Sequence, residues 1–362
     1  MRASGIDAGG RAAAGSLWAA AAEPMGGPMG GLGQACRLNI AAASPNKAQP
    51  QAARGGGHMP SPDIVCMGEP MVEFNQTDGA GHYLFGHGGD TSNCAIAAAR
   101  AGASVGYLTA LGQDEFGDSF VRLWAENGVD AARVIRDAEA HTGVYFVTHG
   151  KDGHVFSYLR KGSAASRMGP ENVAADYIAG AKILHVSGIS MAISATACDA
   201  VFAAIHAARE AGVQVSFDTN LRLRLWPIDR ARAVTEAAMR LCDIALPGMD
   251  DALQLTGLSD PDAIADHYLA LGAKVVALTL GKDGCLVATP AERRRVPGIR
   301  VEAVDATGAG DTFDGNFLAE YLNTGNPFAA ARFANAAAAL STRGYGAVAP
   351  MPRRAEVLAV IG

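Results

Sequence analysis

The sequence has no excess of basic residues, no long apolar segment and no cysteine motif. Its 30 Lys and Arg residues are outnumbered by 36 Asp and Glu, and the formal net charge of -6 argues against a nucleic-acid-binding surface. No apolar run approaches the length needed to span a membrane. The six cysteines lack Cys-x-x-Cys and Cys/His ligand spacing, so we expect buried, reduced thiols in a cytoplasmic protein.

Three common nucleotide-binding motifs are also missing. The chain has neither the Gly-Lys-Ser/Thr of a Walker P-loop nor the His-Arg-Asp of a protein kinase. The nearest approach to a dinucleotide fingerprint, Gly86-x-Gly88-x-x-Thr91, lacks the last glycine and an acidic ribose partner, which speaks against an NAD-dependent dehydrogenase. If the protein binds phosphate groups, it needs a different phosphate site.

Residues 1–60 form a low-complexity leader rich in Ala, Gly, Pro and Ser. Such a segment buries too little apolar surface to fold, so we expect it to be disordered. Its few acids among several arginines superficially resemble a transit peptide. Met59 lies just before the first expected strand, and our preferred interpretation is that the natural chain starts there. One folded domain is expected over residues 61–362.

Within this domain, short Val/Ile-rich segments alternate with Ala-rich helical patterns. The alternation predicts an α/β fold with a three-layer α/β/α body and a mostly parallel central sheet. The expected strands are residues 64–68, 105–110, 183–187, 213–217, 244–246, 275–280 and 285–288, and helices are expected at 92–101 and 116–127. Segments 143–148 and 155–160 flank Lys151-Asp152-Gly153, which predicts a β-hairpin. Ligands of parallel sheets bind beyond the carboxyl ends of the strands.

The strongest functional signal is the run DATGAGDTFDG at residues 305–315. Small residues at Gly308, Ala309 and Gly310 allow close backbone approach, and the apolar spacing that follows predicts a helix starting near Asp311. The first N–H groups of a helix lack internal partners, so they can bind a phosphate. Asp311 could be an N-capping residue, or it could take a proton from a substrate hydroxyl while the neighbouring amides stabilise the phosphoryl group.

A second motif far upstream favours the catalytic interpretation. The run GGDTSN at residues 88–93 opens an Ala-rich helix, and LGQDEFG follows at 111–117. Together the two motifs resemble the paired signatures of the PfkB, or ribokinase-like, family of sugar kinases. The resemblance extends from about residue 63 to the C-terminus. It implies a ribokinase-like fold whose small β lid, here about residues 70–87 and 142–162, covers the site.

Four further segments resemble the branch of this family that phosphorylates 2-keto-3-deoxygluconate at its terminal hydroxyl. They are TGVY at 142–145, YLRKGSAAS at 158–166, SGIS at 187–190 and FDTNLRLRLW at 217–226. Two arginines in these segments, Arg160 and Arg222, suit a substrate carboxylate, although surface salt bridges are the common use of arginine. Strand alternation puts Tyr158 and Arg160 on one face of the hairpin, whereas Arg224 could simply be solvated.

The resemblance also implies a role for each matching residue. Asp311 is expected to act as the base and Gly308, Ala309 and Gly310 as the anion site. The sugar is expected at Gly89, Asn93, Tyr145, Tyr158, Arg160, Arg222 and Asp311. ATP is expected at Asn220, Thr279, Gly281, Gly284, Gly308, Gly310 and Asn335. On residue type alone, Gly281 to Gly284 is more simply a hairpin turn and Asn335 a polar helix residue.

The segment LPGMDD at residues 246–251 departs from the family pattern. Many members carry Asn-x-x-Glu here to organise Mg²⁺, whereas this chain has Gly248 and Asp251. The shorter carboxylate can still hold Mg²⁺ through water, so Asp251 is the expected metal residue. A helix N-terminal acidic pair of Asp250 and Asp251 is an equally good interpretation. A monovalent cation is a further possibility.

Three rival functions stay open from the sequence. The first is a kinase of a neutral sugar, of fructokinase or ribokinase type, within the same class of enzyme. A non-catalytic sugar or nucleotide sensor could use the same fold, although the intact Asp311 disfavours it. The NAD-dependent dehydrogenase is the weakest of the three. Family analogy further suggests a homo-oligomer formed through the lid.

Overall fold

The computed structural model describes residues 61–77, 81–150 and 153–362. The expected leader, residues 1–60, and the turn residues Lys151 and Asp152 lie outside the described residues. No helix within the described ranges is long and apolar enough to cross a membrane. The cysteines at 66, 94, 198, 242 and 285 are buried and free, as expected, whereas Cys36 falls in the undescribed segment.

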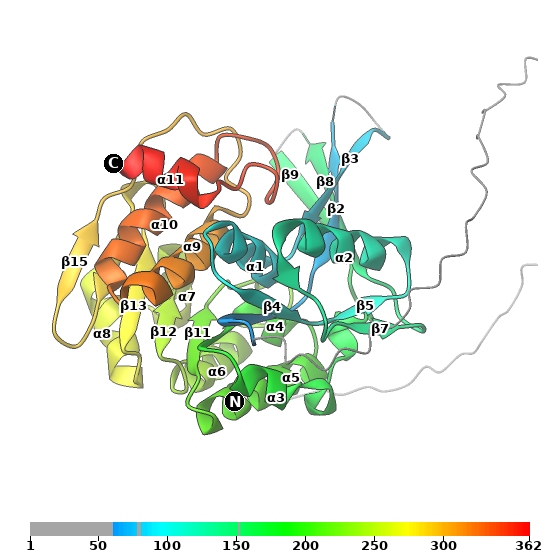
Figure 1. Ribbon diagram of the computed structural model, residues 1–362, viewed down its shortest axis with the longest axis horizontal. Helices are drawn as coiled ribbons and strands as arrows, with labels where there is room; N and C mark the ends of the chain where they lie inside the picture. Colours follow the sequence, from blue (N-terminus) through cyan, green and yellow to red (C-terminus); the bar gives the residue numbers. More distant parts are fainter. Residues whose placement is uncertain (1–60, 78–80, 151–152) are drawn as a thin grey trace, which may run out of the picture. The chain divides into compact units, whose positions relative to one another are not determined.

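A nine-stranded sheet forms the centre of the molecule, in the order β15-β14-β13-β12-β11-β10-β1-β4-β6 (Figure 1). Its strands are β1 Ile64–Met67, β4 Val105–Leu108, β6 Val129–Asp130, β10 Ile183–Ser187, β11 Gln214–Asp218, β12 Ile244–Leu246, β13 Val275–Thr279, β14 Cys285–Ala288 and β15 Arg293–Val296. All neighbours from β6 to β13 pair in parallel, and β14 and β15 pair antiparallel. The expected mostly parallel sheet is confirmed.

Helices cover both faces of this sheet, because successive strand residues point to opposite sides. Ile64 and Cys66 of β1 belong to one apolar core, and Val65 and Met67 to the other. The first core includes α1 Asp90–Arg100, α2 Glu115–Asn127, α9 Ala309–Thr324, α10 Pro327–Ser341 and α11 Arg354–Ile361. The second includes α3 Ala175–Ala179, α4 Gly188–Ala192, α5 Ala195–Glu210, α6 Ile228–Met239, α7 Met249–Thr256 and α8 Pro261–Leu271. The body therefore has three layers.

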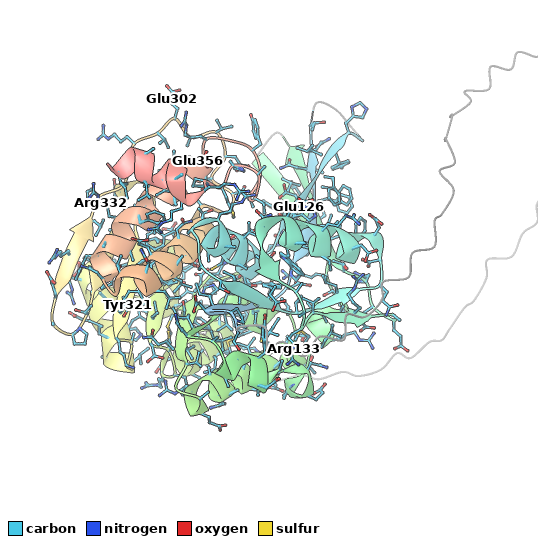
Figure 2. The ribbon with its side chains drawn as sticks, viewed as in Figure 1. Glu126, Arg133, Glu302, Tyr321, Arg332 and Glu356 are labelled. Atoms are coloured by element: carbon cyan, nitrogen blue, oxygen red, sulfur yellow. The ribbon has the colours of Figure 1, made fainter. Side chains whose placement is uncertain are left out.

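The outer helix surfaces carry charged side chains. Glu126 on α2, Arg332 on α10 and Glu356 on α11 are all exposed, and Figure 2 shows them among the side chains around the ribbon. By contrast, α1 and α9 approach each other very closely. A Cβ atom added at Gly315 of α9 would lie 2.3 Å from the carbonyl oxygen of Cys94 on α1. Glycine is therefore required where these two helices cross.

The lid is a separate four-stranded sheet in the order β3-β2-β8-β9. Its strands are β2 Met71–Gln76, β3 Tyr83–Gly88, β8 Gly143–Gly150 and β9 Gly153–Leu159. They follow the two expected lid segments except that β3 runs one residue further, to Gly88, and β8 and β9 pair as the expected hairpin. Phe74 and Phe146 stack at 5.3 Å, and Phe74 meets Phe116 of α2 edge-on at 5.9 Å. Aromatic side chains thus pack the lid against the body.

Most expected boundaries shift by one or two residues, and two of the differences matter for the site. The strand expected over 105–110 is interrupted at Thr109: β4 stays in the large sheet, whereas β5 Ala110–Gly112 pairs with β7 Ile135–Asp137. The helix expected to start near Asp311 starts at Ala309. Short 3₁₀ turns complete the fold at η1 Ala165–Arg167, η2 Pro170–Asn172 and η3 Gly281–Asp283. The earlier start of α9 changes the role of Asp311.

Candidate active site

A cavity of about 1360 Å³ opens at the carboxyl ends of the central strands. Asp218, Leu246 and Thr279, the last residues of β11, β12 and β13, contribute to its wall. Tyr145 and Tyr158 of the lid line it as well. Because parallel strands present their carboxyl ends at one edge, residues distant in sequence converge here.

The start of α9 forms one wall of this cavity. Gly308 is the N-cap with a φ of 74°, and a Cβ atom there would lie 2.9 Å from the Cβ of Ala347. Gly308, Ala309, Gly310 and Asp311 all line the cavity. The Ala309 N–H donates to the Ala306 carbonyl over 3.2 Å. Free N–H groups of this first turn can bind an anionic phosphate.

Asp311 is a residue of the first helical turn and not the cap. The N-cap Gly308 makes no side-chain capping bond, so the capping interpretation of Asp311 is wrong. Its Oδ2 instead accepts a hydrogen bond of 2.8 Å from Nδ2 of Asn93 on α1. Burial and the negative charge of Asp90 raise the pKa of Asp311 to about 7, against the lowering effects of Asn93 and Arg222. Such a carboxylate can accept a proton near neutral pH.

The buried Asp314 and the half-buried Asp218 form a carboxyl pair next to Asp311. Burial raises the pKa of both groups, and for Asp314 the next cause is the charge of Asp218, with which it shares a hydrogen bond. Two carboxyl oxygens can share such a bond only if one carries a proton. Neither Asp218 nor Asp314 was among the site residues predicted from the sequence. The available signal was helical spacing, because Asp314 lies three residues after Asp311 and hence on the same face of α9.

The loop after β11 is held by three carboxylates. Asn220 adopts a φ of 29°, and its Nδ2 donates to Oδ2 of Asp90 over 3.1 Å. The Asn220 N–H donates to Asp218 over 3.1 Å, and the Leu221 N–H donates to Oδ2 of Asp251 over 2.8 Å. Asn220 and Asp251 line the cavity, and their side chains also fix this loop.

Arg160 also differs from its expected role. Its Nε donates to Oε2 of Glu69 over 2.9 Å, and Nη2 donates to the same oxygen. The Ser163 hydroxyl donates to the other carboxylate oxygen over 2.5 Å, and the Glu69 side chain is fully buried. The charge of Arg160 is thus already compensated inside the protein. A free guanidinium for a substrate carboxylate has to come from elsewhere.

Arg222 and Arg224 are the alternatives. Both line the cavity from the loop after β11, and within the described residues neither forms an ion pair with a carboxylate. The Arg224 guanidinium lies 5.7 Å from the ring centre of Tyr158, and Arg160 lies at the same distance. Tyr158 therefore connects the lid with this loop through cation–π contacts. Arg224 is exposed, as expected, and it also lines the cavity.

Tyr145 stands at the rim of the expected sugar site. Its hydroxyl donates to the buried carboxylate of Glu73, and burial with the Glu73 charge raises the pKa of Tyr145 well above its usual value. A Cβ atom added at Gly88 would lie 2.6 Å from this hydroxyl, so the glycine leaves room for the tyrosine. Gly89 and Asn93, the other expected sugar residues, also line the cavity. The expected sugar residues thus gather around one space.

The expected nucleotide residues are only partly brought together. Thr279 and Gly281 line the cavity, and η3 is the hairpin turn between antiparallel β13 and β14. Gly284 and Asn335 lie outside the cavity wall. Asn335 Nδ2 donates to the carbonyls of Val296 and Pro297 over 3.0 and 3.2 Å, and a Cβ at Gly284 would lie 2.2 Å from the Val296 carbonyl oxygen. Both residues fix the chain that follows β15.

The cavity suits a metal that arrives with a nucleotide. In the part of the chain that the structure describes, no group of three or more His, Cys, Asp or Glu could hold a metal ion. Asp250 and Asp251 at the start of α7 line the cavity. Mg²⁺ is commonly held by one or two carboxylates with phosphates and waters. This arrangement fits the residues present.

Comparisons with known proteins agree with this geometry. Residues 61–354 match the model of the pfkB family carbohydrate kinases. The chain is 35% identical over 309 residues to 2-dehydro-3-deoxygluconokinase of Thermoproteus tenax, covering 82% of this chain and 93% of that protein. It is 32% identical over 314 residues to fructokinase-1 of Zea mays, covering 82% and 97%.

A solved structure extends the match to three dimensions. The crystal structure of fructokinase from Vibrio cholerae O395, in a form with fructose, ADP and calcium ion bound, has a TM-score of 0.75 and 29% identity. It covers 83% of this chain and 100% of that one. Sequence and fold therefore agree over nearly all of the described domain, and the chain belongs to the pfkB family of carbohydrate kinases.

Proposed function

We propose that this sugar kinase transfers the γ-phosphoryl group of ATP to the terminal hydroxyl of 2-keto-3-deoxygluconate and forms the 6-phosphate. The observation that carries the proposal is the position of Asp311, which is held by Asn93 next to Gly308 and Gly310 in the cavity wall. A base and an anion site then lie side by side, as phosphoryl transfer to an alcohol requires.

Each step has a residue in place. Asp311 accepts the hydroxyl proton while the sugar oxygen attacks the γ-phosphorus, and ADP leaves. The N–H groups of Gly308 and Gly310 stabilise the charge of the transferred group, whereas the Ala309 N–H already donates to the Ala306 carbonyl. Asp250 and Asp251, which line the cavity, would hold a Mg²⁺ ion that arrives with the nucleotide, and such an ion would supply charge neutralisation for the phosphates. Thr279 and Gly281 bound the nucleotide side of the cavity.

The arginines support an acidic acceptor. Arg160 is neutralised by Glu69, whereas Arg222 and Arg224 reach the cavity without an ion pair among the described residues. A guanidinium binds a carboxylate in a bidentate way that a neutral hexose would not require. The match to 2-dehydro-3-deoxygluconokinase, whose name denotes the same sugar acid, points in this direction as well. The fructokinase matches keep a neutral sugar as the rival.

A panel of acceptors tests the proposal. With ATP and Mg²⁺, the wild-type protein should prefer 2-keto-3-deoxygluconate over fructose and ribose by kcat/KM. Asp311→Asn should lower kcat by about 10²- to 10⁴-fold with little change in ATP affinity. Arg222→Gln should raise the KM for the acid about 10- to 100-fold, the range for a hydrogen bond to a charged group, and leave the KM for fructose unchanged. A wild-type preference for a neutral hexose would contradict the proposed substrate. Near-normal turnover of Asp311→Asn would contradict the assignment of Asp311 as the base.

A further inference from the structure

Asp314 is a buried acid that takes no part in the proposed phosphoryl transfer. It lies on α9 three residues after Asp311, hence on the same face of the helix, and it is only 3% exposed. Its side chain shares a hydrogen bond with Asp218, the last residue of β11. Burying a carboxyl group costs free energy even when it is hydrogen-bonded. A connection between α9 and β11 that carries this cost calls for an explanation.

Asp218 extends the connection into the loop that follows β11. Its Oδ1 accepts the Asn220 N–H over 3.1 Å. The side chain of Asn220 donates to Asp90 on α1, and the Leu221 N–H donates to Asp251 on α7. Asn220 has a φ of 29°, which a residue with a side chain adopts only where its surroundings hold it. The shape of this loop therefore depends on the carboxylates around it.

The next residue of the loop is Arg222, whose guanidinium faces the acids of the cavity. Its Nη1 donates to the Leu221 carbonyl over 2.9 Å, so the backbone of the same loop orients it. The charge of Arg222 counteracts the rise in the pKa of Asp311 and of Asp251, on two sides of the cavity. A bidentate pair with a carboxylate depends on geometry. A small shift of the loop would therefore weaken the binding of a sugar acid.

We propose that Asp314 is a positioning residue, which acts through Asp218 to hold the loop after β11 and thereby keeps Arg222 aligned with the carboxylate of the acceptor. One helix then carries both the base, Asp311, and the group that aligns the acid end of the sugar. The role of Arg222 rests on the proposed function, whereas the link from α9 to the loop does not. Asp314 contacts neither sugar nor nucleotide in this role.

Replacement of Asp314 can separate this role from a general contribution to stability. Asp314→Ala breaks the bond to Asp218, whereas Asp314→Asn keeps a donor for it. Asn316→Ala is the matched control, because Asn316 is a buried polar residue of the same helix whose Nδ2 donates to the Thr312 carbonyl of that helix. Asp218→Ala breaks the same link from the side of β11 and is measured as a second variant, in case Asp314→Ala does not fold.

Asp314→Ala should raise the KM for 2-keto-3-deoxygluconate about 10-fold, the lower end of the range expected for Arg222→Gln, and leave the KM for ATP and for fructose unchanged. In the Arg222→Gln background the same change should add little, because the guanidinium that it aligns is gone. Hydrogen exchange of residues 217–226 should become faster in Asp314→Ala, since the loop amides lose their fixed acceptors. Asp314→Asn should resemble the wild type in both measurements.

Unchanged acceptor KM and unchanged hydrogen exchange in both Asp314→Ala and Asp218→Ala would overturn the proposal. So would an Asp314→Asn protein as impaired as Asp314→Ala, or equal effects in Asn316→Ala, which would indicate α9 stability alone. A loss of kcat at unchanged KM would instead place Asp314 in proton transfer, and a raised Mg²⁺ requirement would make it a metal residue. If the preferred sugar proves neutral, the proposed substrate fails, and the hydrogen exchange of the loop still tests the link.

Discussion

At the scale of single residues, we expect the local electric field around Asp311, the proposed base, to set the pH range of the enzyme. Its pKa is raised to about 7 by burial and by the charge of Asp90. A base must be deprotonated to accept a proton, so it is inactive below this pKa and active above it. The neighbouring carboxylates therefore tune the base without contacting the transferred group.

We expect log kcat/KM to rise with a slope of one at acid pH and to level off above about pH 7. In Asp90→Asn the inflection should move to lower pH, because a negative neighbour that favours the protonated form is gone. The residual activity of Asp311→Asn should lack this inflection. An inflection caused by the ionisation of ATP would instead persist in the variant. A wild-type profile that is flat between pH 5 and 8 would contradict the assignment.

Some roles of single residues could be predicted from the sequence, and others could not. Asp311 could be predicted because its glycine-rich helix start is local in sequence. Glu69 could not, because its partner Arg160 lies 91 residues away. Without the fold, Arg160 looked free to bind a substrate carboxylate. Gly284 and Asn335 were placed at the nucleotide by resemblance, whereas their contacts show that they fix the chain after β15.

At the scale of elements, β11 and α9 meet at the carboxyl pair of Asp218, at the end of β11, and Asp314 on α9. Both pKa values are raised by burial and by neighbouring negative charges. The folded protein therefore keeps a proton that the unfolded chain, with an ordinary Asp pKa near 3.9, has lost. Because the unfolded state binds fewer protons, the free energy of unfolding falls as pH rises from about 4 toward the raised pKa of the pair.

Asp314→Asn should remove much of this pH dependence, since asparagine donates the hydrogen bond without titrating. The wild type should lose up to about 1.4 kcal/mol per pH unit in this window, and the variant should lose less. Urea unfolding between pH 5 and 8 measures the difference. Asp199→Asn, an exposed acid on α5, is the control and should follow the wild type. Parallel curves for wild type and Asp314→Asn would refute the shared proton.

Element positions were largely predictable, and their junctions were not. Runs of Val and Ile marked the central strands because buried parallel strands are apolar on both faces. The break at Thr109 was missed because Ala110 continues the apolar run, and only pairing of β5 with β7 draws the chain out of the large sheet. The loop after β11 was missed for a similar reason: Asp90, Asp218 and Asp251 fix it from three different elements.

At the scale of the whole molecule, the lid carries an unusual amount of exposed apolar surface. Leu84 on β3 and Leu159 on β9 are each 59% exposed, and Tyr83, Phe85 and Val155 are exposed on the same two strands. Within the described lid these are the edge strands of the sheet. Large exposed apolar groups often mark an interaction surface. We therefore propose that a second copy of the chain binds at the lid.

Sedimentation analysis should show a dimer for the wild type and a monomer for the double variant Leu84→Lys, Leu159→Lys, because a charge buried in an apolar contact is strongly disfavoured. The melting temperature of the monomeric variant should stay within a few degrees of that of the wild type at low protein concentration. Leu358→Lys on α11, with a leucine that is 45% exposed, is the matched control and should remain dimeric. A wild type that is monomeric at all concentrations would contradict the proposal.

Because α1 and α9 cross closely at Gly315, the distance between these helices determines how Asn93 and Asp311 are aligned. The hydrogen bond from Asn93 to Asp311 joins residues 218 positions apart in sequence. Both lie on helices whose separation is limited by a residue without a side chain. A single methyl group at Gly315 would push the helix that carries the base away from the helix that orients it. A substitution at Gly315 would therefore abolish activity although it changes none of the residues that contact the sugar or the nucleotide.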